Sequence, residues 1–287
     1  PDQGPQTRPR ALMTNPIAKI VRRARSNFFW SFVFLEKAKR DAIFAAYAFA
    51  RHTDDLVDDA SSPDEATTRL AEWRSGLDGC YQDAPQSDIT KALLPVVRNY
   101  GIPKIYFDEL INGVEMDLSN TRYASFEDLQ TYCYRVASVV GLICIEIFGY
   151  SDPKTKDYAI NLGTALQLTN ILRDVGEDAE RKRIYLPQSD LAEFDCTEAR
   201  ILDRTYDDAF RVMMEFQCAR ARSYYVKAAG YLTDADRKSM VPAETMGRIY
   251  YAILEKIEKR NYQVFDQRIT ISTLWKIGIA AGNWIAR

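Results

Sequence analysis

Helical periodicity is the feature that most constrains the fold of this 287-residue chain. Apolar residues recur at spacings of three and four, which is the pattern of an amphipathic helix. Six long segments carry this pattern: Ala42–Asp59, Asp108–Leu118, Phe126–Tyr150, Tyr158–Asp178, Asp203–Ala229 and Ala243–Tyr262. No alternating strand pattern or low-complexity linker separates them. We therefore predict one all-α domain whose helices surround a cavity, rather than two separate cores.

Residues with turn or capping chemistry lie between these segments. Breaks are predicted at Ser61-Ser62-Pro63 and Gly101-Ile102-Pro103. Ser125 and Thr233 are each followed three residues later by an aspartate, Asp128 and Asp236, and both pairs predict helix starts.

The two ends of the chain differ from its middle. Residues 1–14 are polar and Pro-rich at their start, and we predict a mobile N-terminal extension there. The apolar stretch Ile269–Ile285 is short and contains Lys276. It predicts a closing helix or a peripheral membrane contact rather than a bilayer span.

Composition excludes several classes of function. The net charge is −2 with the two signs nearly balanced, so we expect no nucleic-acid partner. Five scattered cysteines without a CxxC pair, together with a single histidine, His52, indicate neither a disulfide framework nor a zinc site. The expected location is the cytoplasm, with the peripheral membrane contact as an added expectation.

Two acidic motifs carry the strongest chemical signal. They are Arg51–Asp59 and Asn170–Asp178, and each places two aspartates four residues apart. Such a pair lies on one face of a helix, ~6 Å apart along its axis, and the like charges repel unless a cation lies between them. We predict that the four aspartates bind Mg²⁺, with Mn²⁺ as the alternative: Asp54, Asp58, Asp174 and Asp178.

Magnesium suits this pattern because it takes few carboxylates and completes its octahedron with water and phosphate oxygens. Two facing helices of this kind could hold metal ions over a diphosphate and lower the barrier to breaking an allylic C–O bond. The alternative is a solvated helix face, which is the usual explanation of a single DxxxD. Two such motifs, each inside an apolar helix and each beside an arginine, favour the metal site.

Polar residues around the second motif are in phase with its acids. Gln167, Asn170 and Asp174 are spaced three and four apart, so they line one side of a helix. Arg51 precedes the first motif and Arg173 adjoins Asp174, and arginine makes forked contacts to phosphate oxygens. Local ion pairs are the alternative, especially for Arg173.

A family resemblance rests on these residues. The run Gln167–Asp178 continues to Arg183–Pro187, and Tyr47 with Arg51–Asp58 and the stretch Tyr132–Ala137 add to it. From about Ile20 to about Arg268 the chain resembles the squalene/phytoene synthase family. The resemblance implies an all-α isoprenoid-synthase fold around a central apolar cavity, with residues 15–287 as the catalytic domain. It also implies that one prenyl diphosphate ionises and is captured by another, giving a cyclopropyl diphosphate.

The resemblance further implies roles for individual residues. The four aspartates would hold magnesium, and five residues would contact diphosphates or their metals: Arg51, Gln167, Asn170, Arg173 and Arg268. Tyr47, Tyr132 and Tyr250 would line the reacting centre, because an allylic cation requires aromatic faces and the exclusion of water. Phe28, Phe32 and Phe44 are expected in the core or along the tunnel for the prenyl chain.

The product is the least determined prediction. Val136–Cys144 and Gly113–Leu118 resemble bacterial squalene or presqualene-diphosphate synthases, and Phe32 and Phe44 on the tunnel floor would favour C15 chains. We therefore predict condensation of two farnesyl diphosphates through presqualene diphosphate to a C30 product. The alternative is a phytoene synthase acting on two geranylgeranyl diphosphates. A catalytically silent helical subunit is the alternative from another class, although all four aspartates are present. NADPH use and oligomeric state are left open.

Overall fold

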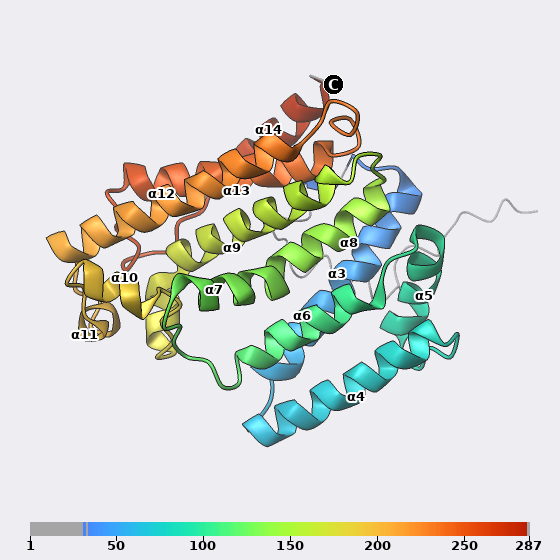
Figure 1. The fold of residues 1–287 in the computed structure, drawn as a ribbon, viewed down its shortest axis with the longest axis horizontal. Helices are drawn as coiled ribbons and strands as arrows, with labels where there is room; N and C mark the ends of the chain where they lie inside the picture. Colours follow the sequence, from blue (N-terminus) through green and yellow to red (C-terminus); the bar gives the residue numbers. More distant parts are fainter. Residues whose placement is uncertain (1–30, 33, 286–287) are drawn as a thin grey trace, which may run out of the picture.

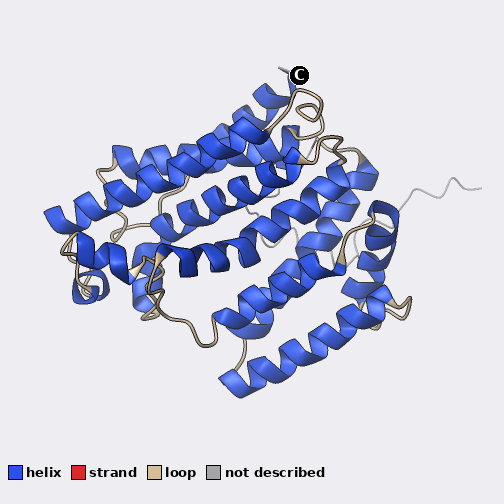
Figure 2. Cartoon of the chain, viewed as in Figure 1, coloured by secondary structure: helices blue, strands red, loops and turns tan. Residues whose placement is uncertain are grey.

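The computed structural model describes residues 31–32 and 34–285, and over these residues it consists of helices and loops without a strand (Figures 1 and 2). The all-α prediction is confirmed. Phe28 and the predicted extension over residues 1–14 lie outside the described residues. The elements are α3 (Lys37–Asp58), α4 (Pro63–Tyr81), α5 (Asp88–Tyr100), α6 (Lys104–Met116), α7 (Phe126–Cys133), a π-helical turn η1 (Tyr134–Ser138), α8 (Val139–Phe148), α9 (Lys154–Glu180), α10 (Gln188–Glu193), α11 (Glu198–Leu202), α12 (Asp208–Tyr231), α13 (Val241–Lys259) and α14 (Thr273–Ile285).

Most predicted helices are confirmed within a few residues, but the start at Asp203 is wrong. The short helix α11 ends at Leu202, and α12 begins at Asp208. Asp207 is the N-cap, because its side chain accepts a hydrogen bond from the backbone N–H of Phe210. A capping side chain thus fixes the boundary more strongly than apolar periodicity does.

One predicted cap is confirmed and the other is wrong. Ser125 and Asp128 form a reciprocal capping box at the start of α7. Asp236 instead accepts hydrogen bonds from the backbone N–H groups of Ser151 and Asp152 and from the Thr155 hydroxyl, at 2.7–2.9 Å. It therefore anchors the turn before α9, and the next helix begins only at Val241.

Helix α9 is the centre of the fold, packed against α12, α13, η1 and α8 (Figure 1). The buried apolar side chains form two clusters rather than a single core around the cavity. The N-terminal half of α9 supplies Tyr158 and Leu162 to the first cluster, and its C-terminal half supplies Leu168 and Leu172 to the second. Both clusters therefore hold this one helix in place.

The turn η1 lies where α6 and α9 approach it closely. A Cβ on Gly163 of α9 would lie 2.6 Å from the Cα of Ser138, and one on Gly113 of α6 would lie 2.7 Å from the Cβ of Arg135. Only glycine permits such contacts, so both residues let α6 and α9 pack directly on η1. π-Helical turns are rare and frequently occur at functional sites.

The continuous helical stretch Phe126–Phe148 is long and apolar enough to cross a bilayer by length and composition. However, 56% of its most apolar window is buried inside the fold. The stretch therefore has the character of a core helix, and it forms one wall of the cavity described below.

Candidate active site

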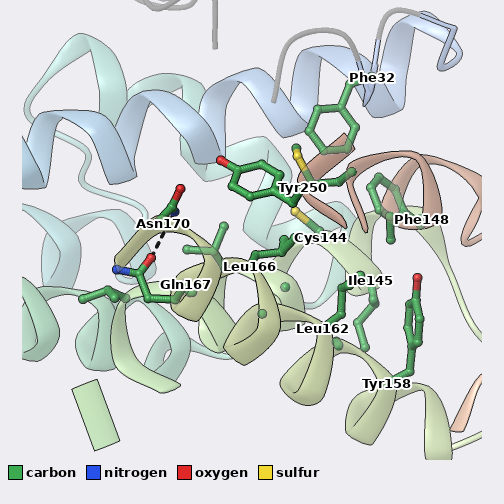
Figure 3. A pocket seen from close by; sticks show the side chains of 18 residues that line it. Phe32, Cys144, Ile145, Phe148, Tyr158, Leu162, Leu166, Gln167, Asn170 and Tyr250 are labelled. Carbon is green, nitrogen blue, oxygen red and sulfur yellow. Dashed lines mark hydrogen bonds between the residues drawn. The ribbon is translucent and has the colours of Figure 1, made fainter. Parts of the chain in front are cut away.

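An apolar cavity runs beside α9, between η1, α8 and α13 (Figure 3). Leu162 and Leu166 of α9 and Cys144 and Ile145 of α8 line its length. Its far end lies beside Phe32 and Phe148, whose ring centroids are 5.8 Å apart. Phe32, expected in the core or along the tunnel, thus lines this cavity. The central apolar cavity expected from the resemblance is present.

The other end of the cavity is polar. Gln167 and Asn170 lie there, and the Asn170 amide donates a hydrogen bond to Gln167 Oε1 at 3.3 Å (Figure 3). One turn further along α9 is Asp174. The cavity therefore leads from aromatic side chains at one end toward the second acidic motif at the other. Phe44 packs against the first cluster and is not among the residues that line this cavity.

The first acidic motif lies in the last two turns of α3. Arg51 pairs with Asp55 at 2.6 Å, rather than with Asp54. Burial raises the pKa of Asp54 to about 7; Arg51 opposes this shift, and the negative charges of Asp58, Asp117 and Asp55 add to it. Asp58, one turn later, is exposed. This motif therefore carries crowded negative charge that a bound cation would relieve.

The second motif is held by two arginines. Asp174 accepts hydrogen bonds from the adjacent Arg173 and from Arg268, whose Nε lies 3.1 Å from Asp174 Oδ1. Arg173 is buried and lies close to Tyr250. Arg268 reaches α9 because its loop packs on Gly176, where a Cβ would lie 3.1 Å from the Val264 carbonyl oxygen.

Asp178, one turn after Asp174, has no such support. Burial raises its pKa to about 7, and the charge of Asp174 adds to the shift. Arg181 and Arg183 oppose it, so the basic run after α9 does lie near the acids. The two motifs are thus alike in leaving one acid of each pair, Asp54 and Asp178, in an unfavourable setting.

Asp117 connects the two motifs, and sequence analysis missed it as a site residue. It follows the last residue of α6 and is close enough to add to the raised pKa of both Asp54 and Asp178. Its carboxylate accepts hydrogen bonds from Tyr132 at 3.1 Å and Tyr185 at 2.9 Å. Burial raises its own pKa. The available signal was an acid at a helix C-terminus, where the helix dipole disfavours negative charge.

The three predicted tyrosines lie in different places. Tyr250 lines the cavity and contacts Arg173, so it joins the apolar and polar parts of the site. Tyr132 lies at the acidic end, with its ring 5.2 Å from that of Tyr185. Tyr47 lies on α3, about one turn before Arg51, and packs against the first cluster.

The donor set fits magnesium only when a ligand completes it. No group of three His, Cys, Asp or Glu side chains among the described residues is close enough to hold a metal ion alone. The Asn170 amide oxygen is buried without a hydrogen-bond partner, and it lies on the same helix as Asp174 and Asp178. Carboxylate and amide oxygens with open positions for phosphate match the coordination that Mg²⁺ prefers.

Comparison with known proteins accounts for this arrangement. The family model described as squalene/phytoene synthase matches residues 21–275. The chain belongs to the squalene/phytoene synthase family. It is therefore a prenyltransferase of the type that condenses two prenyl diphosphates head to head, and the prediction of an enzyme rather than a silent subunit is confirmed.

Individual relatives add detail on the product. The chain is 38% identical over 271 residues to the 15-cis-phytoene synthase of Synechococcus elongatus, covering 90% of this chain and 88% of the relative. It is 37% identical over 271 residues to the phytoene synthase of Arthrospira platensis, covering 90% and 87%. A crystal structure of a dehydrosqualene synthase in complex with ligand superposes with a TM-score of 0.83 at 26% identity and covers 94% of each chain. Among squalene/phytoene synthases, these sequence relatives favour the phytoene alternative over the squalene-type product that we predicted first.

Proposed function

We propose that this enzyme is a magnesium-dependent phytoene synthase that condenses two geranylgeranyl diphosphates head to head. Its sequence relatives support the C20 substrate. Both are named phytoene synthases, and the match covers 88% and 87% of their lengths. The observation that supports it most is structural. Asp117 lies close to the acids of both α3 and α9, and the α9 acids follow the polar end of an apolar cavity along the same helix.

Different side chains have different roles in the ionisation of the first substrate. Magnesium held by Asp54, Asp58, Asp174 and Asp178 would neutralise the negative charge that builds on the departing diphosphate. Arg268 is half-exposed in its pair with Asp174, so it is able to turn to a diphosphate oxygen when one is present. Arg173 is buried, and it fixes the position of Asp174. Asn170 offers its free amide oxygen at the mouth of the cavity.

The cavity governs what happens to the cation. Its lining over Leu162, Leu166 and Ile145 excludes water, which would otherwise trap an allylic cation as an alcohol. Tyr250 presents an aromatic side chain at the junction with the polar end, where it can stabilise positive charge. Capture by the double bond of the second prenyl diphosphate, with loss of a proton, gives the cyclopropyl diphosphate. Departure of the second diphosphate, rearrangement and loss of another proton then give phytoene, without a hydride from NADPH.

Product analysis tests the proposal. The enzyme is incubated with geranylgeranyl or farnesyl diphosphate, with Mg²⁺ or with EDTA, and with or without NADPH, and the lipids are identified by mass spectrometry. We expect phytoene from the C20 substrate, dependence on Mg²⁺ and no effect of NADPH. Turnover of farnesyl diphosphate alone would reject the proposed substrate, and full activity in EDTA would reject the metal.

A C30 product is the second candidate. It is favoured by the rings of Phe32 and Phe148, which stand at the far end of the cavity and shorten the room for a prenyl chain. The same incubations distinguish the two. Presqualene diphosphate, dehydrosqualene or squalene as the main product from farnesyl diphosphate would favour this candidate.

A further inference from the structure

A loop between α9 and α10 contacts the acidic end of the site. It covers residues 181–187, and we call it the 181–187 loop. Tyr185 donates a hydrogen bond to the Asp117 carboxylate at 2.9 Å, and Arg183 donates one to the Asp117 backbone carbonyl at 3.3 Å. The charge of Arg183 also opposes the raised pKa of Asp178. The loop therefore brings a phenol and a guanidinium to the residue that lies near the acids of both motifs.

The backbone of this loop pairs with the segment that follows Asp117. The N–H of Ile184 donates to the Thr121 carbonyl at 3.0 Å. The N–H of Gln188, the first residue of α10, donates to the Tyr123 carbonyl at 2.9 Å. Backbone groups are alike along a chain, and apolar contacts are non-directional. A directional contact between side chains is therefore needed to determine which residues of the loop face Asp117.

Such a contact lies where the loop enters α10. Asp190 of α10 is only 5% exposed, and it accepts hydrogen bonds from Gln217 Nε2 at 2.7 Å and from both terminal nitrogens of the Arg220 guanidinium. Both partners lie on α12. The Arg220 Cζ atom lies 4.2 Å and 4.7 Å from the ring centroids of Phe126 and Phe216. We call Asp190, Gln217 and Arg220 the α10 anchor.

The α10 anchor is better suited to setting direction than to adding stability. Burial takes both charges out of water, and apolar side chains in place of a buried ion pair are often neutral or stabilising. The two N–H···O contacts between Asp190 and Arg220 instead add geometric specificity, and the two rings hold the guanidinium between them. Helix α10 has only six residues, too few to form a stable helix alone, so its position depends on such contacts.

We propose that the α10 anchor positions the 181–187 loop for the reaction, so that Arg183 and Tyr185 stand at Asp117 when the first substrate ionises. The three residues of the anchor are positioning residues, because none of them is among the described residues that line the cavity. They act on the site through the loop, which continues directly into α10. This role rests on the proposed function, since it takes the acids of α3 and α9 as the binding site for the metal and the diphosphate.

An apolar version of the anchor separates positioning from stability. It combines Asp190→Leu, Gln217→Leu and Arg220→Met, so that the charges are removed and no member of the anchor is left unpaired. The urea midpoint of this variant should equal or exceed that of the wild type. Its kcat/KM for pyrophosphate release from the preferred substrate should nevertheless fall by roughly 10²-fold, because a misplacement of about 1 Å can cost this much. Full activity at wild-type stability would reduce the anchor to packing and overturn the proposal.

Coupling to Tyr185 shows whether the anchor acts through the loop. Independent changes multiply in their effects on kcat/KM, so the loss caused by Asp190→Asn should be at least about fivefold smaller in a Tyr185→Phe background. Asp236→Asn is the matched control, because Asp236 is 1% exposed and also accepts three hydrogen bonds, away from this loop. Its loss should be the same in both backgrounds. An equal loss for Asp190→Asn in both backgrounds would mean that Asp190 supports only the fold as a whole.

Hydrogen exchange tests the position of the loop without turnover. In the metal-free protein, the amides of residues 181–189 should exchange at least about tenfold faster in the apolar anchor variant than in the wild type, whereas those of α13 should be unchanged. Unchanged exchange of the loop in this folded variant would contradict the proposal. If the wild type releases no pyrophosphate from any prenyl diphosphate, the proposed function fails. Faster exchange of the loop would then still show that the anchor holds it.

Discussion

The acidic motifs of α3 and α9 have the same spacing but differ in the arginines that pair with their acids. On α9, Asp174 is held by Arg173 and Arg268. On α3, the nearby Arg51 pairs with Asp55 and leaves Asp54 and Asp58 without such an ion pair among the described residues. Asp174 of the α9 motif is thus positioned by ion pairs, whereas Asp178 and the α3 acids keep unbalanced charge that a bound cation would relieve. Two motifs with the same aspartate spacing can therefore differ in how the fold positions their side chains.

Loss of activity should be the largest effect and should be shared by both motifs. Asp54→Asn and Asp174→Asn should each reduce pyrophosphate release from the preferred substrate by about 10³-fold, because each removes a proposed metal ligand at the developing charge. Asp55→Asn is the matched control on α3, since Asp55 lies out of phase with the proposed ligands, and it should stay within about tenfold of the wild type. Near-normal turnover by either ligand variant would exclude its role in the metal site.

Stability should separate the two motifs. Asp174→Asn leaves the buried Arg173 without its charge partner, and breaking a buried ion pair costs about 3 kcal/mol of unfolding free energy. Asp178→Asn, one turn away on the same helix, breaks no ion pair with an arginine in the described structure and serves as the control. Urea unfolding in EDTA measures the difference. Equal stability of the two variants would show that the arginines do not hold Asp174 in place.

Neutralising the unsupported acids should stabilise the metal-free protein above neutral pH. Asp54 and Asp178 have ordinary pKa values of 3.8 that rise to about 7 on folding, so the folded state binds more protons between these limits. The stability that their protonation provides is complete below the unfolded pKa and is lost as pH rises through about 7. At pH 8, Asp54→Asn or Asp178→Asn should therefore add roughly 1 to 2 kcal/mol, allowing for solvent screening.

Thermal unfolding in EDTA at pH 5 and pH 8 measures this effect. The gain should be smaller at pH 5, where the wild-type acids are already largely protonated in the folded state. Asp234→Asn is the control because that side chain is 97% exposed, and it should show no such pH dependence. Destabilisation by both ligand variants at pH 8 would contradict the unbalanced charge that distinguishes Asp54 and Asp178 from Asp174.

The sequence predicted local features well because local chemistry determines them. Periodicity located Phe126–Tyr150 within two residues of the observed Phe126–Phe148, and Ser125 marked its start. The turn η1 inside it was not predicted, because it depends on the close approach of Gly113 and Gly163 from other helices.

Tertiary contacts also explain the errors within the site. Asp117 has no second aspartate at helical spacing, and its role becomes visible only when Tyr132, Tyr185 and the acids of both motifs are seen near it. Asp236 resembled a helix-start residue, but its partners are Ser151 and Asp152, more than 80 residues away. Spacing within one helix could predict Gln167 and Asn170 as neighbours, but it could not predict which aspartate each arginine would pair with.

Arg268→Gln should have the smallest effect and should show whether Arg268 contacts the substrate or supports Asp174. Arg268 is half-exposed, and an exposed ion pair contributes less than about 1 kcal/mol, so the variant should remain nearly as stable as the wild type. If Arg268 turns to the diphosphate, KM should rise about tenfold while kcat falls less, since the lost contact exists before ionisation. Steady-state kinetics with the preferred substrate gives both values. A loss of stability equal to that of Asp174→Asn, with unchanged KM, would mean that Arg268 is part of the support for Asp174 rather than a substrate contact. The loop that carries Arg268 would then help to position Asp174 before any substrate binds.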